Sequence, residues 1–161
     1  METLARKANQ FRNLKELENY IKSHVPENIM QSKDVERLLK KQMYRAVYEI
    51  VYKKYTPHTY ERRGRHGGLA DMRTMEITDA IMKGNTFTMI FQNLAEGNDT
   101  LDGELLTPTI INGIKDNWER EGVWSEPRDF VYETVNNIIA NPKPLIDAVK
   151  KAFVKAGFKV T

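Results

Sequence analysis

The chain has 161 residues, 40% hydrophobic and 29% charged, which predicts one ordinary globular domain with room for a real core. It contains no cysteine, which excludes disulfide bonds, thiolate catalysis and cysteine-ligated zinc. No apolar run approaches the length of a membrane span, and the first residues lack the apolar core of a signal peptide. We therefore expect a protein that is assembled in the cytoplasm and not in a membrane.

The net charge of +3 is distributed in three blocks of alternating sign. Residues 1–67 hold 15 Lys and Arg against 8 Asp and Glu, residues 68–140 hold 5 against 13, and residues 141–161 hold 5 against 1. A general nucleic-acid coat would be basic throughout. Blocks of opposite sign suit a subunit whose basic side meets the acidic side of a neighbour, as in a head-to-tail ring. Neutralisation within one fold would give the same pattern.

The N-terminal third predicts two helices. The first runs from about residue 13 to residue 23 and should end before Pro26, because the residue before proline avoids the helical region. The second spans about residues 33–55, with Ser32 as its N-cap. The apolar residues of the second helix recur at the helical period: Val35, Leu38, Leu39, Met43, Ala46, Val47, Ile50 and Val51.

A second stripe of the longer helix consists of Tyr44, Tyr48, Tyr52 and Tyr55. Tyrosine is enriched at protein interfaces because its ring packs while its hydroxyl stays hydrated. The stripe is therefore a hint of oligomerisation. A broad, half-buried face within one subunit would show the same residues.

Residues 60–71 read Tyr-Glu-Arg-Arg-Gly-Arg-His-Gly-Gly-Leu-Ala-Asp. Glycine allows positive φ, so we expect a looped arm that carries the positive charge of Arg62, Arg63, Arg65 and His66. Such an arm can neutralise phosphates, with Tyr60 available to stack on a base. The arginines can equally pair with the acidic middle block of the same or a neighbouring subunit.

A β-hairpin is predicted after the arm, because residues 75–82 and 86–92 alternate in hydropathy around Lys83-Gly84-Asn85. The segment at Tyr60 is a candidate third strand. The residues expected on the apolar side of the hairpin are Met75, Ile77, Ile81, Phe87, Met89 and Phe91.

The C-terminal half predicts three helices: a short one from Thr107-Pro108 to Gly113, a second over residues 130–140, and an amphipathic one over residues 145–156 that ends at Gly157. Together the elements predict an α+β fold. A small antiparallel or mixed sheet would be flanked by a long N-terminal helix and C-terminal helices, with an extended Arg/Gly-rich arm or hairpin.

No motif indicates an active site. His24, His58 and His66 lack the spacing of metal ligands, and the glycines form no phosphate-binding loop. The acidic residues between 98 and 104 miss the ligand spacing of a calcium loop. We therefore expect a protein that is not an enzyme, with no catalytic residues, no cofactor, no metal and no small-molecule substrate.

Four short motifs follow one another along the chain: Tyr60-Glu-Arg-Arg63, Gly67-Gly-Leu-Ala-Asp71, Ile110-Ile-Asn-Gly113 and Trp124-Ser-Glu-Pro-Arg-Asp-Phe130. Their order resembles the small head–tail connector, or neck, proteins of tailed bacteriophages, which include minor capsid and tail-completion proteins. The resemblance spans residues 33–159. Residues 1–30 would be a helical extension of that core within a single domain.

The resemblance implies a structural virion protein that forms a ring at the head–tail junction and joins the portal complex to the tail around the DNA channel. Its partners would be further copies of itself and other neck, portal or tail proteins, with non-specific contact to packaged DNA. The alternative is a small nucleic-acid-binding protein without sequence specificity that uses the Arg62–Arg65 arm. The residues expected at oligomer or partner interfaces are Tyr44, Tyr48, Tyr52, Tyr60, Arg62, Arg63, Arg65, Trp124 and Arg128, and the candidate DNA-channel contacts are Arg62, Arg63, Arg65 and His66.

Overall fold

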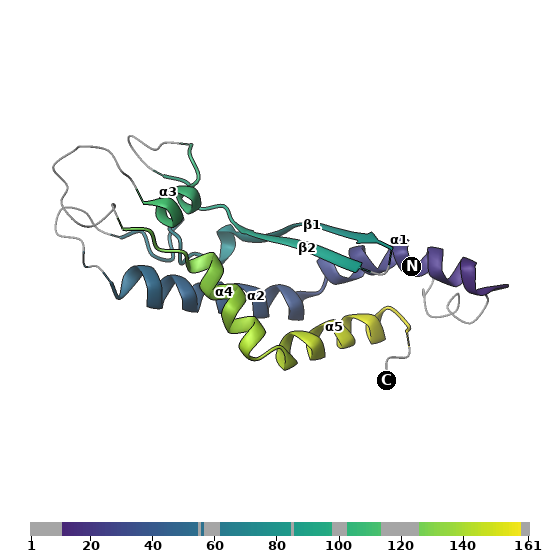
Figure 1. Ribbon diagram of the computed structural model, residues 1–161. Coiled ribbons are helices and arrows are strands. Elements are labelled where there is room, and N and C mark those ends of the chain that lie inside the picture. Colours follow the sequence, from purple (N-terminus) through teal and green to yellow (C-terminus); the bar gives the residue numbers. More distant parts are fainter. Residues whose placement is uncertain are drawn as a thin grey trace. The chain divides into compact units, whose positions relative to one another are not determined.

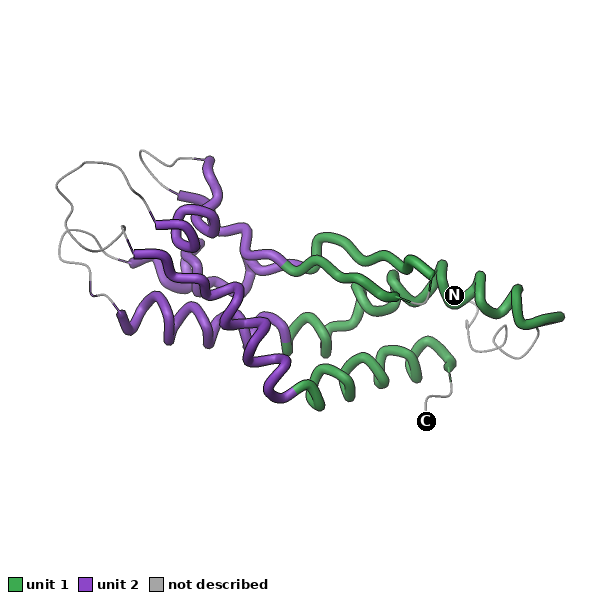
Figure 2. Tube along the Cα trace, in the orientation of Figure 1, with its two compact units in different colours: residues 1–38, 77–91, 142–161 green, residues 39–76, 92–141 purple. Residues whose placement is uncertain are grey.

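The chain divides into two compact units, each built from segments that are distant in sequence (Figure 2). Unit 1 contains Met1–Leu38, Ile77–Phe91 and Pro142–Thr161, and unit 2 contains Leu39–Glu76 and Gln92–Asn141. The computed structural model describes residues 11–54, 56, 62–84, 86–97, 103–113 and 126–158.

The described residues form five α-helices, two short helices of other types and one antiparallel two-stranded sheet (Figure 1). The predicted α+β fold class is therefore confirmed. In chain order the elements are α1 (Leu14–Met30), α2 (Lys33–Ala46), the π-helix η2 (Val47–Tyr52), the 3₁₀-helix η3 (Met72–Thr74), β1 (Met75–Lys83), β2 (Thr86–Asn93), α3 (Leu106–Asn112), α4 (Phe130–Ala140) and α5 (Lys143–Lys155).

Helix α1 is longer than the sequence predicted. Asn13 is its N-cap, and the Asn13 side-chain oxygen accepts a hydrogen bond from a backbone N–H of the first turn at 2.9 Å. The prediction that this helix ends before Pro26 is wrong, because α1 continues through it. A proline inside a helix costs about 3 kcal/mol. The burial of Val25 and Ile29, worth about 1.5–3 kcal/mol each, offsets that cost.

Unit 1 has a small core where α1 packs against α5. The Nζ atom of Lys155 in α5 lies 3.3 Å from an Asp34 carboxylate oxygen in α2, which adds a polar contact at the edge of this core. The buried residues that α1, α2 and α5 contribute to unit 1 are Val25, Ile29, Val35, Ala148 and Ala152.

The long helix predicted from residue 33 is confirmed as far as Tyr52, but its last part changes type. Ser32 acts as the predicted N-cap, because its Oγ accepts a hydrogen bond from Val35 N at 3.5 Å. Helix α2 passes directly into η2, where Lys53 N donates to Tyr48 O, five residues back, at 2.9 Å. Single turns of π-helix are rare in proteins, and those that occur are often found at functional sites.

The predicted hairpin is confirmed, and within the described residues its sheet has the two strands β1 and β2. In β1 the burial alternation changes phase after Ile77, so that Ala80 and Met82 are half-buried. The prediction that Ile81 shares the side of Met75 and Ile77 is therefore wrong, and its side chain is 42% exposed. In β2 the predicted apolar face, Phe87, Met89 and Phe91, is half-buried.

The three C-terminal helices are confirmed with small shifts at their ends. Helix α3 begins at Leu106, one residue before the prediction, and is followed by the predicted Gly113, whose φ is 70°. Helix α4 has the predicted bounds. Helix α5 begins at Lys143 and is followed by Gly157, whose φ is 90°. Glycine adopts this left-handed conformation without a Cβ clash, which explains both stops.

The N-cap of α4 gives a first testable prediction. Asp129 Oδ1 accepts a hydrogen bond from Tyr132 N at 2.7 Å, so Asp129→Ala should lower the free energy of unfolding by about 1 kcal/mol. Urea denaturation measures this change. Asp129→Ser keeps a capping oxygen and should lose much less. An equal loss in both variants would contradict the capping role.

Candidate functional site: the Arg/Gly arm

The Arg/Gly arm, residues 62–71, packs in unit 2 against the helix formed by α2 and η2. Arg62 donates a hydrogen bond from Nη1 to the carbonyl oxygen of Tyr52 at 3.0 Å. Its guanidinium carbon also lies 4.7 Å from the centre of the Tyr52 ring. The last carbonyls of a helix lack helical partners and carry partial negative charge, so a guanidinium is well placed there.

Tyr52 is held by both ends of the arm. Besides its contacts with Arg62, its hydroxyl oxygen accepts a hydrogen bond from the backbone N–H of Ala70 at 3.3 Å. Burial raises the pKa of the Tyr52 hydroxyl, so the side chain stays neutral at physiological pH. Tyr52 therefore fastens the arm to the end of η2.

Removing the Tyr52 hydroxyl tests this contact. Tyr52→Phe keeps the ring but leaves the buried N–H of Ala70 without its acceptor, which should lower the free energy of unfolding by about 1 kcal/mol. Tyr48→Phe is the matched control, because the Tyr48 side chain is 46% exposed. Urea denaturation should show a smaller change for the control. If both variants lose the same stability, the hydroxyl of Tyr52 has no special role.

The two other arginines of the arm also contact their own chain. Arg63 Nη2 donates a hydrogen bond to the backbone oxygen of Glu96. Arg65 Nη2 lies 3.4 Å from the Tyr44 hydroxyl, and the guanidinium lies 5.7 Å from the centre of the Tyr44 ring. Tyr44 and Tyr52 of the predicted stripe thus each support one arginine of the arm within a single chain.

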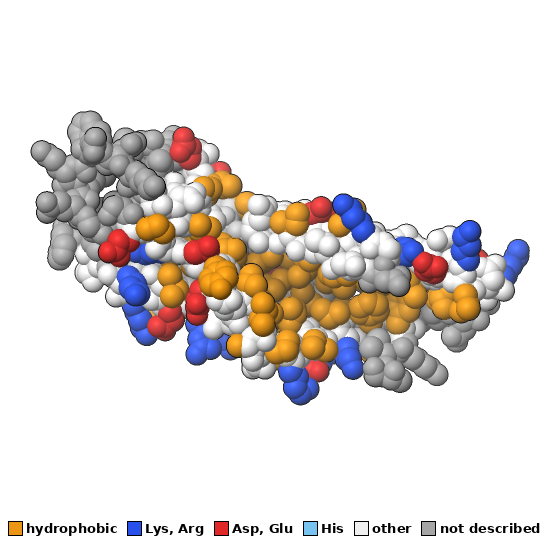
Figure 3. Space-filling view, in the orientation of Figure 1, with side chains coloured by type: hydrophobic (Ala, Val, Ile, Leu, Met, Phe, Trp, Pro, Cys, Tyr) orange, Lys and Arg blue, Asp and Glu red, His pale blue; other side chains and the backbone are white. Residues whose placement is uncertain are grey.

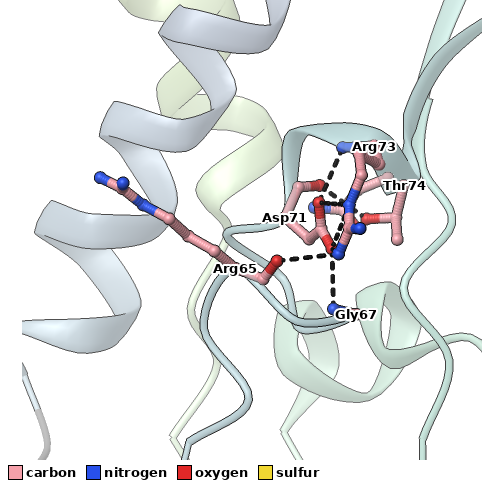
Figure 4. A network of polar contacts seen from close by, with 6 residues as sticks. Arg65, Gly67, Asp71, Arg73 and Thr74 are labelled. Carbon is pink, nitrogen blue, oxygen red and sulfur yellow. Dashed lines mark hydrogen bonds and ion pairs between the residues drawn. The ribbon is translucent and has the colours of Figure 1, made fainter.

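A buried carboxylate organises the interior of the arm (Figure 4). The Asp71 side chain accepts hydrogen bonds from the backbone N–H of Gly67 at 2.7 Å and from Arg73 Nη2 at 2.6 Å. Arg73 Nη2 also donates to the carbonyl oxygen of Arg65 at 3.1 Å. The hydrogen bonds from Arg73 hold the pKa of Asp71 far below its usual range. Asp71 therefore stays ionised and joins the arm to the start of η3.

Asn93, at the end of β2, ties the arm to the sheet. It is buried, its Nδ2 donates to the carbonyl oxygen of Leu69 at 2.7 Å, and its Oδ1 accepts from Ala95 N at 3.0 Å. Positive φ at Gly64 and Gly67 turns the chain between these anchors. The arm is thus a series of turns held at several points.

The structure brings together five of the predicted interface residues, namely Arg62, Arg63, Arg65, Tyr44 and Tyr52, whose contacts are given above. The other predicted residues lie elsewhere. His66 and Tyr48 are exposed, and Lys53 Nζ lies 5.7 Å from the Tyr48 ring centre. Arg128 is buried, and its backbone N–H donates to Ile110 O at 3.0 Å. Tyr60 and Trp124 lie outside the described residues.

Sequence reasoning missed the roles of Asp71, Arg73 and Asn93. Asp71 is the N-cap of η3, and an aspartate at the end of a glycine-rich turn is a signal of such a cap. Asn93 is the polar residue that ends the alternating pattern of β2. A polar side chain at that position indicates a partner for loop backbone.

Within the described ranges, no group of three or more His, Asp or Glu side chains is placed to hold a metal ion. No helix in this part of the chain is long and apolar enough to cross a bilayer. Asp71 is the one buried carboxylate of the arm, and it accepts hydrogen bonds from the backbone of Gly67 and from the Arg73 side chain. Asp71 is therefore a structural part of the arm.

The profile of the YomN family matches residues 13–155, which include every helix and strand named above. No curated protein and no solved structure matches the chain.

Proposed function

The chain belongs to the YomN family, and from this premise we propose that it is a structural subunit of a phage virion. It forms a ring at the head–tail junction and joins the portal complex to the tail around the DNA channel. The family name is that of a phage-derived, SPbeta-like gene of Bacillus, which supports a phage-associated protein. The order of the four sequence motifs, which resembles that of head–tail connector proteins, supports a position at the head–tail junction.

The hairpin is the observation that carries the proposal of an assembled subunit. A two-stranded sheet is marginally stable in isolation, and within the described residues each strand has an outer edge without a neighbouring strand. Ile81 is 42% exposed and Ile90 is 45% exposed. Exposed apolar side chains on so small a sheet are typical of a surface that another chain covers.

The arm supports the same proposal through its charge. Its internal contacts leave Arg65 and His66 exposed. The acidic residues of the 68–140 block supply carboxylates that suit such a basic surface on a neighbouring copy. In this arrangement the arm grips the adjacent subunit, and its exposed groups also face DNA where the ring surrounds the channel.

The position of the protein in purified virions tests the proposal directly. Mass spectrometry should detect the chain in the particles, and imaging of labelled virions should place it at the neck. Detection in the capsid shell or the tail tip, or absence from the particles, would overturn the proposed place.

A pair of variants at Ile90 tests the role of the hairpin in assembly. Ile90→Asp should abolish incorporation into particles while the monomer keeps its unfolding transition, because a carboxylate cannot be buried against an apolar partner. Ile90→Leu keeps the volume and the hydrophobicity and should assemble. Normal incorporation of the Asp variant would exclude the hairpin as the covered surface.

Non-specific nucleic-acid binding is the second candidate, favoured by the exposed Arg65 and His66. Affinity for duplex DNA is measured against salt concentration for the wild type and for Arg65→Ala, with exposed Arg45 of α2 as the control position. Loss of one phosphate contact should reduce the salt slope by about one for Arg65→Ala only. Negligible affinity in every protein would exclude this function. Arg62 and Arg63 are unsuitable targets because both hold the arm in place.

A further inference from the structure

An apolar groove lies in unit 1 between α1 and α5. Its volume is about 570 Å³. Figure 3 shows hydrophobic side chains gathered on the face of unit 1 that includes this groove. A smaller hollow of about 230 Å³ shares Ile21 with it and reaches Met82 of the hairpin. The residues that line the larger hollow, which we call the α1–α5 groove, include Ile21, Leu145, Ile146, Val149, Phe153 and Phe158.

Helix α4 carries an apolar stripe that points to solvent. Tyr132 is 64% exposed, Val135 46% and Ile139 68%, while Phe130 and Thr134 of the same helix are buried. The three exposed positions follow the spacing i, i+3 and i+7, so they form one line on the helix. That spacing is the pattern of anchor residues by which an amphipathic helix binds a hydrophobic groove.

We propose that the α4 stripe of one copy of this chain docks in the α1–α5 groove of the next copy. The proposal rests on the proposed function and names the contact between neighbouring subunits of the ring. The length of the α4 stripe agrees with the length of the groove. Residues 145–153 of α5 extend about 12 Å along the groove, and residues 132–139 of α4 extend about 10 Å, at 1.5 Å per residue.

Charge complementarity selects this pair of surfaces. Helix α4 with its N-cap contains two acidic residues, Asp129 and Glu133, and no basic residue. Helix α5 contains four lysines and one aspartate, and Lys150 lines the groove. Two α4 surfaces would place like charges together, and so would two α5 surfaces. The contact is therefore between unlike surfaces, and when it is made head to tail it generates a closed ring or an open filament.

The absence of cysteine from the chain allows a clean cross-linking test. Ile139→Cys on α4 and Ile146→Cys in the groove are made as separate single variants, mixed and oxidised. A disulfide needs Cβ atoms about 4 Å apart, so the mixture should give a cross-linked dimer. Val154→Cys replaces the groove variant in the control mixture, because Val154 is 58% exposed on α5 and does not line the groove.

The cross-link yield decides between the possible contacts. The yield is measured at the highest concentration at which the protein stays soluble. A yield no higher than that of the Val154→Cys control overturns the proposal. A dominant homodimer of Ile139→Cys alone also overturns it, because it shows that α4 contacts α4 of the other copy and not the groove. A cross-link that forms only between the α4 and groove variants supports it.

A charge exchange provides an independent readout by sedimentation velocity. Lys150→Glu should weaken self-association about two- to fivefold, the range of an exposed ion pair, and Glu133→Lys on the opposing copy should restore it. Ile139→Ala should weaken it about tenfold, as loss of an anchor residue does. Unchanged association in all three variants would contradict the contact.

The same cross-link, tried in purified virions, separates failure of this contact from failure of the proposed function. If the protein is found at the neck but does not form the cross-link there, the contact is overturned and the neck function still stands. A cross-link in solution combined with absence from the virion neck overturns the neck function and supports the contact.

Discussion

Gly68→Ala should lower the free energy of unfolding by about 2 kcal/mol, because the arm has no room for a side chain at this position. A Cβ atom on Gly68 would lie 2.9 Å from both the backbone nitrogen and the backbone oxygen of Gly64. These are main-chain atoms of the turn and cannot rotate away as a flexible side chain would. Gly68 is also buried, so the strain cannot be relieved into solvent. Urea denaturation of wild type and variant measures the loss.

Gly84→Ala distinguishes the steric clash with the Gly64 backbone from the ordinary cost of placing alanine at positive φ. Gly84 lies in the hairpin turn with a φ of 59°, and apart from its chain neighbours no atom of the described residues lies within 4 Å of the position that its Cβ would take. Alanine at this position should therefore cost only the strain of the left-handed region, about 1 kcal/mol. A loss as large as that of Gly68→Ala would show that packing against Gly64 is not the cause.

The local sequence pattern was enough to predict most of the secondary structure. The bounds of α4 follow from its apolar spacing and from Asp129, because both signals lie within the helix and its cap. The errors occurred where tertiary packing outweighs a local preference. Pro26 remains within α1 because Val25 and Ile29 are buried around it. Ile81 faces solvent because the burial phase of β1 changes, which an alternating sequence does not reveal.

The arm could be located from the sequence, but its contacts could not. Density of arginine and glycine is a local property, so the charged turn between residues 62 and 71 is visible in the chain itself. The partners of these side chains are remote: Arg63 and Glu96 are 33 residues apart, and Asn93 and Leu69 are 24 residues apart. Whether an arginine pairs within its own chain or with a neighbour depends on such long-range packing.

Asp71→Asn should lower the free energy of unfolding at neutral pH by about 2 kcal/mol, because it removes charge-assisted hydrogen bonds inside the arm. The carboxylate accepts from the backbone of Gly67 and from the backbone and side chain of Arg73. An asparagine retains one acceptor oxygen, but its NH₂ group is a donor and cannot pair with a guanidinium. Asp147→Asn is the control, because the Asp147 side chain of α5 is half-buried and is paired only with surface Lys143, and this variant should change stability little.

The effect of Asp71→Asn should also depend on pH, and the sign follows from the lowered pKa. An aspartate in the unfolded chain has a pKa of about 3.9, whereas the hydrogen bonds from Arg73 hold the pKa of Asp71 in the folded protein well below its usual range. Below about pH 4 the unfolded state binds the proton first, so the stabilisation that Asp71 provides is complete above that pH and declines as the pH falls further. Urea denaturation between pH 7 and about pH 3 should therefore show the difference between wild type and Asp71→Asn shrinking in acid. A difference that stays constant over this range would mean that the ionised carboxylate does not hold the arm together.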